Sequence, residues 1–193
     1  MDFPRTNGWP TVRDCLELMS RFGMPPHVVR HSQAVCGVAL YLGRGLLIHG
    51  VRMDLDLIRA GALLHDITKV HSFKRPLDHA LTGAKLLRKL GYPRQVEAIV
   101  RQHVRLGRSR PRGRITEIEI VNYSDKRIVN DQVTSLAERL AYIRDRYART
   151  PEAAARIEEY AKVTFRLEEE IFEVLPGSAS QVLAVDPFKE LEK

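Results

Sequence analysis

The chain has 193 residues and a net charge of +7, with 44% hydrophobic and 28% charged residues, and this composition is that of an ordinary folded domain. No apolar stretch approaches the roughly 18 residues of a membrane span, and the first residues lack the basic and then apolar pattern of a secretion signal. We therefore expect one domain, or one domain with a small appendage, in the cytoplasm. Cys15 and Cys36 lie in helix-like segments without metal-type spacing, so we expect buried free thiols.

Apolar residues recur with the 3.6-residue period of helices along nearly the whole chain, and no convincing strand alternation appears. The expected helices begin at capping residues or prolines and end at glycines, prolines or polar turns. They cover about residues 11–22, 26–44, 54–65, 78–91, 93–103, 116–128, 132–147 and 150–175. From residue 178 onward we expect a loosely held tail. The sequence therefore predicts an all-α protein.

Arginine is concentrated in one segment between two expected helices. Residues 101–114, "RQHVRLGRSRPRGR", contain six arginines and no acidic residue. Such a segment favours an anionic partner, which could be a nucleotide, a nucleic acid or a membrane surface. A solvated basic loop is an equally good interpretation of this segment taken alone.

Several ionisable residues fall on helix faces that should be buried. His31 shares a stripe with Val35, and His103 shares one with Val96. Asp125 lies four residues after Val121 and therefore falls on the side of its helix that should be buried. An unpaired carboxylate in a core destabilises the fold by several kcal/mol or more. Asp125 therefore needs a cation, which Lys126, Arg127 or a metal ion could supply.

Together these residues suggest a metal centre rather than isolated polar groups. His31, His65, Asp66 and Asp125 would give one ion two imidazoles and two carboxylates, and His79 and His103 could hold a second ion with Asp66 bridging. This thiolate-free set of donors suits Mn²⁺, Fe²⁺, Co²⁺, Ni²⁺ or Zn²⁺. Water activated by such ions can attack phosphorus at neutral pH. Lys69, one turn after His65, could hold a phosphate oxygen.

Five segments, in order, resemble the HD-domain superfamily of metal-dependent phosphohydrolases. They are "RHSQAV" (30–35), "GALLHDITK" (61–69), "HALTGAKLL" (79–87), "LGYPRQVEAIVRQHV" (90–104) and "NYSDKRI" (122–128). The resemblance implies a helical bundle with extra C-terminal helices. It also implies that the first histidine, the His-Asp pair and the late aspartate bind one metal, and that the two middle histidines bind a second.

The resemblance also suggests how the chain is organised and which subgroup it is closest to. Together with the helical periodicity outside the resembling segments, it gives an N-terminal helix within residues 1–25, an HD domain over 26–147, a C-terminal helix over 148–177 and a tail over 178–193. Val104 follows His103 where the cyclic-di-GMP phosphodiesterases of this superfamily have a glutamate. The motifs are more similar to those of small stand-alone HDIG-type proteins, which include dinucleoside-tetraphosphate hydrolases.

We therefore expect an enzyme that hydrolyses a phosphoester or phosphoanhydride of a small, nucleotide-type substrate, with Asp66 and Lys69 in the catalytic centre and no membrane partner. The arginines of the basic loop would attract the polyanionic substrate; they are Arg108, Arg110, Arg112 and Arg114. A non-catalytic module that binds nucleotide or nucleic acid is the alternative.

The number of ions depends on one expected contact. His79 lies twelve residues before the Gly91-Tyr92-Pro93 turn and His103 lies ten after it, on helices that the short turn makes antiparallel neighbours. Their levels along this hairpin should differ by only about 3 Å, given a rise of about 1.5 Å per residue. We therefore expect two ions, and imidazoles more than about 8 Å apart would exclude a shared second site.

Overall fold

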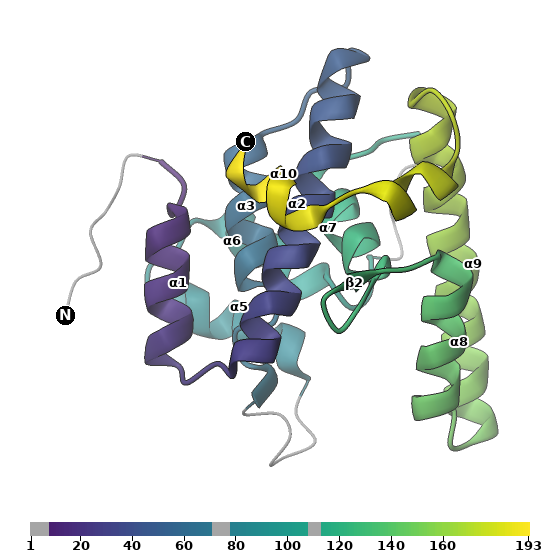
Figure 1. Ribbon diagram of the computed structural model, residues 1–193. Helices are drawn as coiled ribbons and strands as arrows, with labels where there is room; N and C mark the ends of the chain where they lie inside the picture. Colours follow the sequence, from purple (N-terminus) through teal and green to yellow (C-terminus); the bar gives the residue numbers. More distant parts are fainter. Residues whose placement is uncertain (1–7, 71–77, 108–112) are drawn as a thin grey trace.

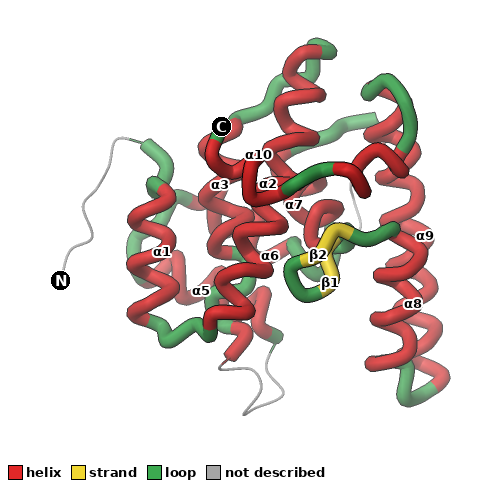
Figure 2. The backbone as a smooth tube through the Cα atoms, viewed as in Figure 1, coloured by secondary structure: helices red, strands yellow, loops and turns green. Residues whose placement is uncertain are grey.

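The computed structural model describes residues 8–70, 78–107 and 113–193, and these ranges are mostly helical (Figure 1). One short two-stranded sheet interrupts the helices (Figure 2). The elements are α1 (Val12–Arg21), α2 (Pro26–Ile48), α3 (Leu55–Leu64), α5 (His79–Lys89), α6 (Arg94–Gln102), α7 (Glu117–Asp125), β1 (Ile128–Val129), β2 (Gln132–Val133), α8 (Leu136–Tyr147), α9 (Pro151–Val174), the 3₁₀ helix η1 (Ala179–Ala184) and α10 (Pro187–Glu192). The predicted all-α class is confirmed.

The long helix α2 forms the centre of the bundle. Its residues 34–40 are all buried, so this part of the helix is covered on every side. Helices α3, α7 and α10 pack against it. A side chain that α2 directs toward α3 and α7 is therefore held by a well-packed core, and His31 is such a side chain.

Helix α3 ends where the His-Asp pair begins. Its start is fixed by Asp54, whose carboxylate accepts hydrogen bonds from the backbone N–H groups of Asp56 and Leu57. The helix ends at Leu64, and a turn carries the chain through residues 65–68. Both members of the His-Asp pair are buried within this turn.

Helices α5 and α6 form the expected hairpin. Asp78 caps α5 by accepting a hydrogen bond from the backbone N–H of Leu81. Gly91 has a φ of 81° in the turn, a backbone conformation that residues other than glycine rarely adopt. This tight turn returns α6 along α5, so the first residue of α5 and the residue after α6 lie at the same end.

The segment between α7 and α8 corrects one prediction. We expected helix through residue 128 and again from residue 132, whereas residues 128–133 form the β1–β2 hairpin. Asn130 occupies the left-handed region with a φ of 56°, which asparagine tolerates better than most residues. Helix α8 begins only after Ser135, which forms a capping box with Glu138. Turn and capping chemistry outweighed apolar periodicity here.

The C-terminal segment corrects a second prediction, because residues 178–193 are packed rather than loosely held. The carbonyl oxygen of Pro187 lies so close to Gly37 of α2 that a β-carbon there would be 1.8 Å from it. The Nη1 atom of Arg44 donates to Oε2 of Glu190 at 2.8 Å. Helix α10 thus crosses α2, as Figure 1 shows.

Two other expectations concern the chain as a whole. Cys15 and Cys36 are buried free thiols, as predicted. Within the described ranges, no helix is both long enough and apolar enough to cross a membrane.

Candidate metal centre

The six residues predicted as metal ligands lie together in the core of the bundle. His31 comes from α2, and the other five lie at or next to an end of α3, α5, α6 or α7; they are His65, Asp66, His79, His103 and Asp125. Bringing them together depends on where four helices begin or end. Their placement agrees with the predicted set.

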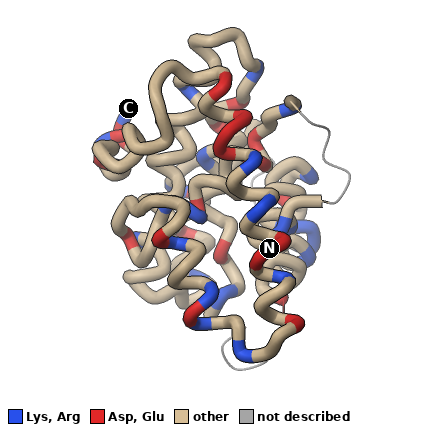
Figure 3. Tube along the Cα trace, turned by 90° about the vertical axis from the view of Figure 1, so that its right-hand side faces the viewer, with Lys and Arg blue, Asp and Glu red and all other residues tan. Residues whose placement is uncertain are grey.

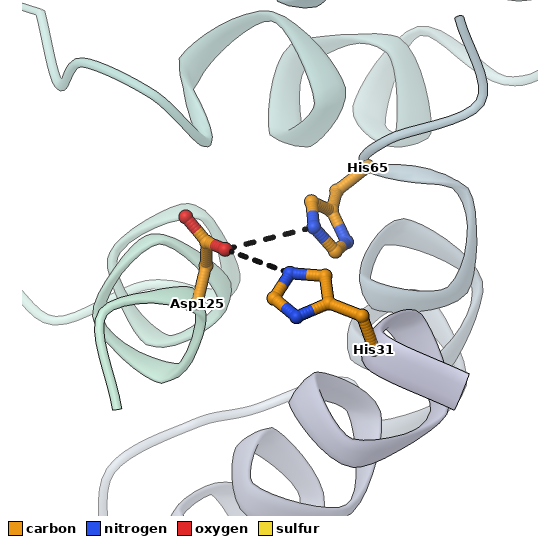
Figure 4. A group of neighbouring side chains, drawn as sticks. All are labelled: His31, His65 and Asp125. Carbon is orange, nitrogen blue, oxygen red and sulfur yellow. Dashed lines mark hydrogen bonds and ion pairs between the residues drawn. The ribbon is translucent and has the colours of Figure 1, made fainter. Parts of the chain in front are cut away.

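One group of donors joins α2, the end of α3 and α7. The Oδ1 atom of Asp125 lies 3.2 Å from Nε2 of His31 and 3.7 Å from Nε2 of His65. Figure 4 shows both rings directed at this carboxylate oxygen. The two ring centroids are 5.4 Å apart, so three donors from three elements face one small volume.

Asp66 lies between this group and a second pair of histidines. Its Oδ2 atom is 3.3 Å from Nε2 of His65 and 3.8 Å from Nε2 of His31. Its Oδ1 atom is 3.5 Å from Nε2 of His79 and 3.5 Å from Nε2 of His103. The two oxygens of one buried carboxylate therefore face two different pairs of imidazoles.

The two middle histidines meet as the hairpin geometry predicts. The Nε2 atoms of His79 and His103 are 3.2 Å apart, well inside the 8 Å limit given above. The side chain of His79 is 28% exposed, whereas that of His103 is 2% exposed. The centre therefore opens toward solvent on the side of His79.

Backbone carbonyls orient three of the four imidazoles. The Nδ1 atoms of His31, His65 and His103 lie 2.7 Å from the carbonyl oxygens of Asn130, Ala62 and Val100, respectively. A carbonyl only accepts, so each Nδ1 carries the proton and donates. Each Nε2 then directs a lone pair into the centre, the arrangement in which histidine binds metals.

The donors fit divalent metal ions. Two atoms that each lie about 2.1 Å from a shared ion are roughly 3 to 3.4 Å apart at ordinary bond angles. Several donor pairs described above have such separations. The Nε2 atom of His65 is buried and has no hydrogen-bond partner, which a metal bond would provide. Burial and the neighbouring His103 imidazole lower the pKa of His79 to about 4, so this side chain is neutral at pH 7.

Lys126 is the cation that Asp125 requires within the protein. Its Nζ atom lies 3.1 Å from Oδ2 of Asp125 and also donates to the carbonyl oxygen of His103. Burial tends to raise the pKa of Asp125, but Lys126 and His31 outweigh it and hold that pKa well below the usual range. Arg127, the other candidate, instead donates to Tyr123 and to the carbonyl oxygen of Thr134.

Lys69 lies at the opening of the centre. Its Nζ atom is 2.5 Å from Oδ2 of Asp66, and its side chain is 31% exposed. Burial tends to raise the pKa of Asp66, but His65 and Lys69 outweigh it and hold that pKa well below the usual range. A partly exposed ammonium beside the donors can reach a bound anion.

The sequence interpretation missed one arginine near this centre. Arg139 lies on the buried stripe of α8 with Leu136 and Leu140, and its Nε atom is buried without a hydrogen-bond partner. Its positive charge contributes to lowering the pKa of Asp125. Arg139 lies three residues after Leu136, and this helical spacing could have indicated that it faces the core. Attention to the basic loop, which does not include Arg139, left this signal unused.

The arginines of the basic loop are only partly described. Arg114 is exposed. Arg108, Arg110 and Arg112, the proposed substrate-binding arginines, lie outside the described residues.

A family model for the HD domain matches residues 28–150. A tRNA (cytidine(56)-2'-O)-methyltransferase of Thermoplasma volcanium is 31% identical over 98 residues, which are 51% of this chain and 27% of that protein. A dihydroneopterin 2',3'-cyclic phosphate phosphodiesterase of Methanocaldococcus jannaschii is 30% identical over 62% of this chain and 52% of its own length. The chain thus spans about a quarter to a half of these curated relatives.

Among solved structures, a predicted HD superfamily hydrolase from an uncultured Thermotogales bacterium is 20% identical, with a TM-score of 0.47 over 85% of this chain and 92% of that one. The family match covers well over half of the 193 residues and includes all six proposed ligands. This chain belongs to the HD-domain family.

Proposed function

We propose that the protein is a metal-dependent phosphohydrolase whose centre holds two divalent transition-metal ions. The observation that carries this proposal is the placement of Asp66, whose two oxygens face two separate histidine pairs. A carboxylate in that position suits a bridging ligand between two ions. In a core without metal, the same arrangement would leave the lone pair of His65 Nε2 unused.

Each ion would have its own set of donors, with Asp66 common to both. His31, His65 and Asp125 would complete the first set, and His79 and His103 the second. Bound divalent ions supply Lewis acidity toward phosphoryl oxygens and lower the pKa of water to near neutrality. The chain orients the donors through the carbonyl contacts at Nδ1 and closes the buried side of the centre.

Two cations would bind the phosphoryl group of a substrate. Lys69 lies at the opening, and its ammonium can move from Asp66 to a phosphate oxygen when metal ions neutralise the carboxylate. The guanidinium of Arg139 lies over the ring of Tyr142, and its Nε has no hydrogen-bond partner in the protein. Both would bind the anion, and both would stabilise charge that develops on the equatorial oxygens.

A nucleotide-type substrate with a phosphoester or phosphoanhydride bond suits this centre. The name of the Methanocaldococcus relative denotes hydrolysis of a 2',3'-cyclic phosphate. The name of the Thermoplasma relative denotes modification of a tRNA ribose by methyl transfer. We therefore include cyclic phosphodiesters, as well as mononucleotides and dinucleoside polyphosphates, among the substrates to test.

The function is tested with protein purified without chelator. We expect close to two transition-metal ions per chain, and hydrolysis of at least one substrate class after loading with Mn²⁺, Fe²⁺, Co²⁺, Ni²⁺ or Zn²⁺. Metal content is measured by mass spectrometry and product by phosphate release or chromatography. Failure to retain any of these ions after reloading would contradict the proposal, and so would inactivity of the loaded protein toward the whole panel.

Replacing Lys69 tests its assignment to the phosphate. Charge-assisted hydrogen bonds contribute about 1.5–3 kcal/mol, so Lys69→Met should lower kcat/KM roughly tenfold to a hundredfold. Metal content should stay that of the wild type, because Lys69 is not among the six donors. Lys162→Met, an exposed change on α9, serves as the control. Loss of metal with the substrate affinity unchanged would assign Lys69 to the ligands instead.

A further inference from the structure

The outer face of the α5–α6 hairpin carries a concentration of positive charge. Residues 78–107 contain six lysines and arginines and two acidic residues, a net charge of 6 − 2 = +4. All six cations are exposed; they are Lys85, Arg88, Lys89, Arg94, Arg101 and Arg105. We call these six residues the α5–α6 basic face.

Helical spacing places these cations on one side of the hairpin. On α5, Lys85 is followed at the third and fourth positions by Arg88 and Lys89, while Ala84 and Leu87 are buried. On α6, Arg94 and Arg101 are seven residues apart, two turns along the same side, and the buried residues between them face the core. The basic face is therefore continuous over both helices.

A buried carboxylate holds two of the guanidinium groups in place. Glu97 is 5% exposed, and its Oε2 and Oε1 atoms accept hydrogen bonds from Nε of Arg88 at 2.9 Å and from Nη2 of Arg101 at 3.0 Å. The three residues together keep a charge of +1, and the two arginine side chains remain 63% and 44% exposed. Their remaining N–H groups are thus fixed in position and available to an anion.

Negative charge is concentrated in the C-terminal region of the chain. Residues 151–193 contain five lysines and arginines and ten acidic residues, a net charge of 5 − 10 = −5. Figure 3 shows cationic and acidic positions along the Cα trace in a second view. The hairpin is thus basic and the C-terminal region acidic, while the rest of the chain carries the remaining +8, and this difference favours a polyanion at the hairpin over the C-terminal region.

The basic face leads to the opening of the metal centre. Helix α5 begins at His79 and α6 ends immediately before His103, so the hairpin carries two proposed ligands at one end. The centre opens beside the partly exposed His79 and Lys69, while Asp66 is 1% exposed. A duplex is too wide to reach a carboxylate that is buried in this way, whereas the end of a single strand could approach it.

We propose that the α5–α6 basic face binds the phosphodiester backbone of a single-stranded nucleic acid. Guanidinium groups held at fixed positions suit successive phosphates, and binding to phosphates needs no particular base sequence. The surface contains none of the six proposed metal ligands. Binding at this surface is therefore independent of the proposed hydrolysis, and each can fail without the other.

The experiment measures binding of a labelled twelve-nucleotide single strand, as RNA and as DNA, by fluorescence anisotropy over a range of salt concentrations. The test variant is Lys85→Gln/Lys89→Gln/Arg94→Gln in the full chain, which removes three exposed cations and leaves the Glu97 cluster intact. The control is Arg149→Gln/Arg156→Gln/Lys162→Gln, which removes three exposed cations of the region around α9. The two variants have the same net charge.

Each lost phosphate contact reduces the slope of log K against log salt by about 0.7 for a single strand, so the test variant should lose about 2 from the slope. Its affinity at low salt should fall on the order of tenfold, while the control retains the wild-type slope and affinity. Equal losses in the two variants would overturn the proposal, because the effect would then reflect net charge alone. Absence of strand binding by the wild type would overturn it too, even if the protein bound vesicles of anionic phospholipid.

Discussion

We expect Asp66→Asn to abolish hydrolysis while leaving the fold intact. The amide keeps the shape of the side chain but loses the charge that attracts both proposed ions. Lewis-acid chemistry contributes several kcal/mol to transition-state stabilisation, which corresponds to roughly a thousandfold in rate. The loss should appear mainly in kcat rather than in KM, because Lys69 and Arg139, the proposed phosphate-binding residues, are unchanged.

A second measurement separates loss of metal from loss of fold. A ligand that binds only the folded state raises the thermal midpoint, so added metal should raise the Tm of the wild type and have a much smaller effect on Asp66→Asn. Asp145→Asn, at an exposed position of α8, should behave as the wild type in both assays. If Asp66→Asn retained two ions per chain and the wild-type rate, Asp66 could not be the bridging ligand.

The sequence was sufficient to predict most of the helices and which six side chains lie together, because both depend on local patterns. Helical periodicity placed His31, His103 and Asp125 on inward faces, and the structure buries all three. The short turn at Gly91 predicted that His79 and His103 would meet, and their Nε2 atoms are 3.2 Å apart. These inferences needed only helix geometry and the order of the elements.

What the sequence could not provide depends on contacts between distant segments. The carbonyl of Asn130 orients His31 only because residues 128–133 leave the helical pattern and form a hairpin. The packing of Pro187 against Gly37 joins residues 150 positions apart, a contact that no local sequence pattern indicates. Arg139 reaches the centre from a helix whose placement depends on the same hairpin.

The sequence also left open whether Lys126 or Arg127 is the partner of Asp125. Adjacent residues on a helical turn point about 100° apart, and the sequence does not show which of the two side chains faces Asp125. The structure assigns Lys126 to Asp125 and turns Arg127 toward Tyr123 and α9, where its Nη1 atom lies 3.3 Å from Oε2 of Glu168. Lys126 thereby connects the two halves of the metal centre. Its ammonium contacts the carboxylate of Asp125 and the carbonyl oxygen of His103.

We therefore expect Lys126→Met to be strongly destabilising. The substitution leaves Asp125 buried with one fewer cationic partner, and breaking a buried pair in this way costs about 3–5 kcal/mol. It also removes one of two donors to the carbonyl of His103, which keeps the hydrogen bond from Nδ2 of Asn122, and loss of such support for metal ligands weakens metal affinity by up to roughly tenfold to a hundredfold. Urea unfolding of the chelator-treated protein measures the first effect, and competition with a chelator of known affinity measures the second.

A double-mutant cycle shows whether the pair itself is responsible. In the apoprotein, Asp125→Asn/Lys126→Met removes both charges, so it should be less destabilised than the sum of the two single variants by more than about 1 kcal/mol. Additive effects would instead mean that Lys126 acts through its packing and the carbonyl of His103 rather than through Asp125. Metal affinity should remain low in the double variant, because Asp125 is itself a proposed ligand. Recovery of stability in the double variant is therefore the result that assigns Lys126 to the carboxylate of Asp125.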